Sequence, residues 1–154
     1  MRLLAYISTF LVAAFPVFAV ADDFNIEEEK LVALPKPIEA AIRSTKGFEF
    51  GACKLIGRTV DLANQGTNSG FVATTAGACG WGAAVGPIWV VRDGTKPATV
   101  LAHGGYSLTL GKQIQNSLRN IAISAGTAGW YMESLWKFDG ERYVKVKEKS
   151  GVNR

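Results

Sequence analysis

Few residues in this chain could carry out covalent chemistry. His103 is the only histidine, so any Ser-His-Asp or Cys-His arrangement would have to use it. It stands beside Gly104-Gly105 at a predicted turn, and no neighbour in the sequence would orient its ring. Asp61 and Glu133 are the carboxylates that turn geometry does not explain, and sequence does not show whether they lie together. A hydrolase using Asp61, His103 or Glu133 is therefore the competing hypothesis, and no catalytic residue is assigned.

The two cysteines, Cys53 and Cys79, indicate a disulfide rather than a metal site. Two cysteines and one histidine offer at most three ligands, and no ligand-pair spacing is present. In an exported chain a disulfide is the default state of such a pair. We therefore expect a Cys53–Cys79 bridge, no metal and no cofactor.

Residues 1–21 are typical of a secretory signal peptide. Met1-Arg2 gives a positive start, the run from Leu3 to Phe15 is almost wholly apolar, and Ala19-Val20-Ala21 is a small-x-small cleavage site. The apolar run is shorter than the roughly 20 residues that a membrane-spanning helix needs. We expect a periplasmic or secreted protein without a membrane anchor after cleavage, and the 133 remaining residues suit one domain.

The charge balance argues against nucleic acid as the partner. Removing residues 1–21 leaves 16 basic and 13 acidic residues, a mild excess. The only dense basic run, Lys145, Lys147 and Lys149, alternates with Val144 and Val146 at its start, which is typical of the solvated face of a strand.

The chain is expected to begin with a helical arm over residues 22–47. Asn25 and Glu28 form a capping-box pattern for a helix over residues 26–33, although a loosely ordered acidic arm fits residues 22–34 equally well. Pro37, with Ile38, Ala41 and Ile42 on one face, predicts a second short helix that ends near residue 45.

Residues 48–154 read as a single β-rich domain. Asp93-Gly94 and Asp139-Gly140 follow apolar, Trp-bearing runs and predict hairpins with type I′ turns. Strands are expected at residues 48–50, 55–62, 71–75, 87–92, 98–102, 106–110, 119–125, 130–138 and 143–147, with a polar loop at 111–118. The predicted fold is mainly β, an antiparallel meander, a sandwich or a partly closed barrel with a short helical segment at its N-terminus.

Residues 60–72, with the turn cluster from Asn64 to Gly70, resemble the strand-turn-strand motif of FG-GAP/VCBS-like repeats. The continuation to residue 146, with Cys79-Gly80 and the terminal Phe138-Asp139-Gly140 hairpin, resembles small exported bacterial proteins of mostly unknown function. The resemblance implies a periplasmic β-rich protein. FG-GAP loops that bind calcium use several carboxylates, whereas this loop keeps only Asp61, so we expect weak calcium affinity.

The Gly-rich loop around Cys79 is the predicted binding surface. Trp and Tyr dominate binding hot spots because one rigid side chain covers a large area. Trp81 fits a core position and a binding position equally well, whereas Trp89, Trp130 and Trp136 fit the core. The expected binding residues are Trp81, Gly80, Gly82, Tyr106 and Tyr131.

These residues predict an exported, non-enzymatic binding or protein-interaction module whose partner is an unidentified protein or envelope component. An inhibitor or immunity protein that blocks a cell-wall hydrolase is the alternative within the binding class, and a structural envelope component is a third possibility.

Mass spectrometry of the unreduced mature protein tests the two processing predictions together. We expect a chain that begins at Asp22 and has no free thiol, because export places both cysteines in an oxidising compartment. Two alkylatable thiols in the folded protein would contradict the bridge.

Overall fold

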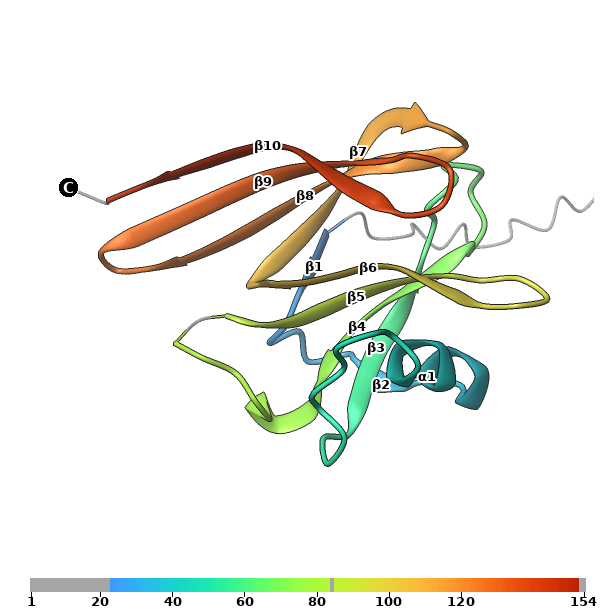
Figure 1. The fold of residues 1–154 in the computed structure, drawn as a ribbon, viewed down its shortest axis with the longest axis horizontal. Coiled ribbons are helices and arrows are strands. Elements are labelled where there is room, and N and C mark those ends of the chain that lie inside the picture. The colour runs from blue at the N-terminus through green and yellow to red at the C-terminus, as the bar shows by residue number, and fades with distance from the viewer. Residues whose placement is uncertain (1–22, 84, 153–154) are drawn as a thin grey trace, which may run out of the picture.

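The computed structural model describes residues 23–83 and 85–152, so the predicted signal peptide and Asp22 lie outside the described residues. Two five-stranded antiparallel sheets and one short helix make up the fold (Figure 1). Sheet I has the order β1-β7-β8-β9-β10 and sheet II the order β2-β3-β4-β5-β6. The elements are β1 (Asp23–Asn25), β2 (Val32–Ala33), α1 (Lys36–Arg43), β3 (Leu55–Val60), β4 (Gly70–Thr75), a 3-10 turn (Ala76–Ala78), β5 (Gly86–Arg92), β6 (Ala98–Gly105), β7 (Ser107–Gln115), β8 (Leu118–Thr127), β9 (Trp130–Phe138) and β10 (Tyr143–Gly151). The mainly β, antiparallel prediction is confirmed.

Strand β5 is buried on both faces and connects the two halves of the core. Ile88 and Val90 pack in the cluster between the sheets, whereas Trp89 and Val91 pack in a second cluster under α1. Alternation places successive side chains on opposite faces, so an almost continuous apolar run becomes a strand covered on both sides.

Helix α1 closes the outer face of sheet II. Pro37 lies in its first turn, where a missing backbone N–H costs nothing, and the helix ends at Arg43, close to the predicted boundary. Ile38 and Ile42 are one turn apart and buried against the cluster that contains Trp89.

The prediction of a helix over residues 26–33 is wrong. Asn25 Oδ1 does accept a hydrogen bond from the backbone N–H of Glu27, at 3.0 Å, but in a turn and not in a helix cap. The segment instead crosses between the sheets: β1 pairs with β7 in sheet I and β2 pairs with β3 in sheet II. An Asx turn and a helix cap use the same side-chain oxygen, so the local pattern fits both.

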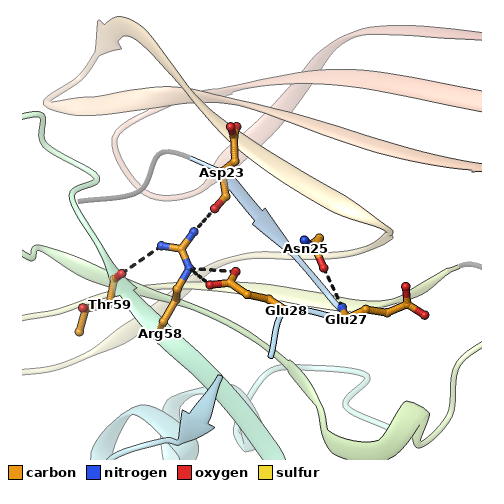
Figure 2. A network of polar contacts seen from close by, with 6 residues as sticks. All are labelled: Asp23, Asn25, Glu27, Glu28, Arg58 and Thr59. Atoms are coloured by element: carbon orange, nitrogen blue, oxygen red, sulfur yellow. Dashed lines mark hydrogen bonds and ion pairs between the residues drawn. The ribbon is translucent and has the colours of Figure 1, made fainter. Parts of the chain in front are cut away.

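Arg58 on β3 holds this crossing segment in place (Figure 2). Its guanidinium forms an ion pair with the Glu28 carboxylate, at 3.0 Å, and donates to the backbone carbonyl of Asp23. The same group lies 5.9 Å from the centre of the Phe24 ring. One side chain of sheet II therefore contacts both the strand that joins sheet I and the loop that follows it.

Two further expectations about local structure are wrong. Residues 48–50 form no strand, and residues 111–118 are not a loop, because β7 runs to Gln115 and β8 begins at Leu118. Asn116 and Ser117 have φ values of 49° and 73° and make the tight turn between them. The turn uses Asn-Ser in left-handed conformations, a weaker signal than Asn-Gly.

The Asp-Gly turns are present but are not type I′. Only the glycines have positive φ, 148° at Gly94 and 114° at Gly140, and each loop is longer than two residues. Asp139 Oδ1 accepts the backbone N–H groups of Glu141 and Arg142, both at 2.8 Å, and these bonds lower the pKa of its carboxyl. The aspartate closes its loop through its side chain.

Replacing Arg58 with Met tests the role of the crossing segment. Loss of the ion pair and of the charge-assisted hydrogen bond should lower the free energy of unfolding by about 1–2 kcal/mol. Hydrogen exchange should accelerate first at residues 23–28. Lys112→Met, on an exposed part of β7, is the matched control, and equal effects of the two changes would contradict this role.

Candidate binding groove

The Cys53–Cys79 disulfide joins the two segments that flank the β3–β4 hairpin. Cys53 precedes β3, Cys79 follows β4, and their Sγ atoms are 2.01 Å apart, so the structure contains the expected bridge. Closing a loop of 26 residues contributes on the order of 3 kcal/mol in the chain-entropy model. The segment after α1 and the loop before β5 are thereby held beside each other.

Trp81 is held inside the fold and does not project from the loop. Its indole N–H donates to Thr75 Oγ1 at 2.8 Å, and the Thr75 hydroxyl donates to the Cys79 carbonyl at 2.6 Å. The ring is half-buried against the core between the sheets, and a Cβ on Gly86 would lie 2.9 Å from it. The geometry gives Trp81 a part in setting the shape of the loop, and direct contact with a partner stays a prediction.

A groove of about 410 Å³ lies between the two disulfide-linked segments, on the outer face of sheet II. Its aromatic side is built by Phe48, Phe50 and Trp89, with ring centres 5.4–6.0 Å apart. Gly80 and Gly82, two of the predicted binding residues, line the opposite side. One side of the groove packs on the buried Trp89, and the loop on the other side begins at the disulfide-bonded Cys79.

Gly80 allows the loop to lie close to the aromatic side. Its φ is 73°, and a Cβ at this position would come within 2.7 Å of the Phe50 ring. Glycine is the residue type that meets both conditions without strain. The glycine after Cys79 is therefore explained by backbone conformation and packing, without a bound phosphate or other anion.

His103 lies at the groove on strand β6, so the prediction of a solvated turn histidine is wrong. It pairs with Ile88, and its ring meets Trp136 of sheet I edge-on at 4.8 Å between centres. Its Nδ1 lies 2.6 Å from the carbonyl oxygen of Gly104. Among the described residues, no carboxylate or nucleophilic side chain forms a hydrogen bond with the His103 ring, although its charge acts on the Glu148 carboxyl.

The three residues of the hydrolase hypothesis do not meet. Asp61 is buried and accepts the backbone N–H groups of Gln65 and Gly66, at 3.1 and 2.6 Å, so it closes its own turn. Glu133 is exposed on β9, opposite Ser124 and Lys149, at a hollow that neither Asp61 nor His103 lines. The geometry supports no shared chemistry among them.

Tyr106 and Tyr131, the remaining predicted binding residues, line a different hollow beside the β8–β9 turn. The Tyr106 hydroxyl donates to Glu27 at 2.9 Å, and this bond to a carboxylate raises the pKa of the phenol. Trp130, expected in the core, is 39% exposed at the same turn. The predicted set is therefore divided between two places.

Metal binding and membrane spanning find no support in the described residues. Residues 23–83 and 85–152 contain no group of three or more His, Cys, Asp or Glu side chains that could hold a metal ion. Within the same residues, no helix is long and apolar enough to cross a membrane.

No family model, no curated protein and no solved structure matches this chain. The resemblance to FG-GAP/VCBS-like repeats therefore stays a prediction.

The aromatic side of the groove is the part that sequence reasoning missed. The sequence pattern predicts a strand at Phe48 and Phe50 and a core position for Trp89. Trp89 is indeed only 4% exposed, yet it borders the groove. In the sequence, these three aromatic residues are marked only by the Gly-rich segments near them. The packing of their rings against one another depends on the disulfide and on α1.

Thr75→Val tests whether the Trp81 contact sets the loop. The change removes a hydroxyl that both accepts and donates, and it leaves the indole N–H without its acceptor, so the free energy of unfolding should fall by about 1–3 kcal/mol.

Thr74→Val is the matched control. Thr74 is also fully buried, but its hydroxyl has no hydrogen-bond partner among the described residues. Its replacement should leave the free energy of unfolding unchanged or slightly raised. Urea unfolding measures both, and equal losses in the two variants would contradict the assignment.

Proposed function

We propose that this protein is an exported, non-enzymatic interaction module that binds an apolar or aromatic side chain of a partner protein in the groove beside the Cys79 loop. The observation that carries the proposal is the groove itself, with three packed aromatic rings on one side and a disulfide-tied glycine loop on the other. Its volume of about 410 Å³ falls in the range of ordinary binding pockets.

The composition of the groove favours binding over catalysis. Among the described residues that line the groove, Lys46 is the only one with a permanent charge, and none is a carboxylate. The hydroxyl present, on Thr45, donates to the backbone carbonyl of Ala41 at 3.3 Å. A nucleophile activated by a base, which covalent catalysis requires, is not assembled by these side chains.

A disulfide-bonded cysteine pair supports an oxidising, exported compartment. The periplasm is the location we propose, since residues 1–21 have the pattern of a secretory signal and the chain resembles exported bacterial proteins. A groove with a disulfide-tied loop suits such a protein, because a preorganised site avoids the entropy cost of ordering loops on binding.

Gly82→Arg tests the groove without disturbing the core. Gly82 is exposed, its φ suits an ordinary residue, and a Cβ there meets nothing closer than 4.0 Å. The arginine side chain should fill the mouth of the groove and reduce capture of partners from envelope extract at least about tenfold, as loss of one hot-spot contact does.

Gly129→Arg is the matched control. It places the same side chain in open space at the β8–β9 turn, near the hollow of Tyr106 and Tyr131. Capture should survive this change. If Gly129→Arg abolishes capture and Gly82→Arg does not, the tyrosine hollow is the site and the proposal for the groove is wrong.

A further inference from the structure

The two sheets have four edge strands, and three of them are protected against pairing. β1 contains three residues, and β2 contains two. β10 carries Lys145, Lys147 and Lys149 and a register irregularity between the first two. Short length, lysines and bulges are the usual means by which proteins keep edge strands from adding another strand.

Strand β6 is the exception. It has eight residues, Ala98–Gly105, and contains no Lys, Arg, Asp, Glu or Pro. It pairs with β5 on one side only. Its bulge lies near its start, between Thr99 and Leu101, which pair with Val91 and Val90 of β5. Residues Leu101 to Gly105 pair with β5 in regular register. The N–H and C=O groups of β6 that point away from β5 have no strand partner in the described part of the chain.

The open edge of β6 borders two hollows that meet. The aromatic groove reaches residues 102–104, and a second hollow of about 500 Å³ reaches residues 99–102. The hollows share Thr45, Lys46 and Ala102. Small side chains at Ala102 and Gly104 keep the edge accessible from the outer face of the sheet.

The charge along this edge is positive. Lys46, Arg142 and Lys145 line the second hollow, and no carboxylate lines either one. Lys145 is already paired with Glu148, whose pKa it lowers, and the charge of Arg142 helps to lower the pKa of Asp139. Lys46 also lines the hollow and has no ion pair among the described residues. An extended segment carrying carboxylates would complement this surface, since charge complementarity fixes partner and register.

We infer that an acidic, extended segment of a partner protein adds to the free edge of β6 as a further strand. Its backbone pairs with residues 101–104, one of its side chains enters the aromatic groove, and its carboxylates face Lys46 and Arg142. Strand addition takes affinity from main-chain hydrogen bonds and specificity from pockets for alternate side chains. This inference rests on the proposed function and adds the chemistry of the partner.

A second copy of this chain is a poorer occupant of the same edge. Pairing of β6 with its own copy would bring two sets of Lys46 and Arg142 to one interface, and like charges placed opposite each other are destabilising.

The experiment titrates the mature protein with short synthetic peptides and measures the Kd by calorimetry. The first peptide alternates Val and Glu around one central Phe, and the second has every Glu replaced by Lys. Two more carry the acidic sequence with backbone N-methyl groups on either the odd or the even residues.

The acidic peptide should bind and the lysine peptide should not. One N-methyl peptide should lose binding while the other keeps it, because only alternate N–H groups of an added strand face its neighbour. The double variant Lys46→Glu, Arg142→Glu should raise the Kd about tenfold, whereas Lys112→Glu, which changes an exposed β7 lysine outside both hollows, should not.

Three outcomes would overturn the inference: no binding of the acidic peptide, equal binding of both N-methyl peptides, or a dimer in which β6 amides are protected. If one of these occurs while Gly82→Arg still abolishes capture, the groove binds its partner without strand addition and the proposed function stands. If Gly82→Arg also leaves capture intact, the proposed function fails as well.

Discussion

The Cys53–Cys79 disulfide is the constraint on which the groove depends. It closes the open end of the β3–β4 hairpin and sets the segment after α1 beside the loop before β5. Thr75 and Trp81 extend the constraint through the loop, since one hydroxyl joins the indole to the backbone of Cys79. Without the bridge, the backbone hydrogen bond from the Ala76 N–H to the Lys54 carbonyl would still join the two segments, but the Gly80–Gly82 loop would lose its covalent link to the Phe48–Phe50 segment.

Burial of β5 on both faces explains why β6 is left at an edge. The strand needs the other sheet on its inner face and α1 on its outer face to cover Ile88, Trp89, Val90 and Val91. The chain leaves sheet II directly after β6 and enters β7 of sheet I through Tyr106, so no later strand returns to pair with β6. The same crossover places His103 against Trp136 and brings the start of β10 opposite the free edge.

Much of the fold follows from local patterns in the chain. The apolar run at residues 87–91, the alternation along residues 130–138, Pro37 before Ile38 and Ile42, and the two Asp-Gly loops each predict an element within a few residues of its bounds. Two of the failures share a cause, because a side-chain oxygen or a pair of glycines is compatible with more than one backbone conformation. Asn25 caps a turn instead of a helix, and His103-Gly104-Gly105 continues a strand because β5 supplies a partner for each residue. The groove could be foreseen only in part: Gly80 and Gly82 marked its loop, but the aromatic side arises from long-range packing that spacing along the chain does not encode.

Hydrogen exchange of the mature protein, alone and bound to a partner captured from envelope extract, distinguishes binding at β6 and the aromatic groove from binding elsewhere. Amides on the free edge of β6, within residues 101–104, should become strongly protected on binding, together with the Cys79 loop. Protection confined to the tyrosine hollow beside the β8–β9 turn, with β6 amides unchanged, would contradict binding at β6 and the groove.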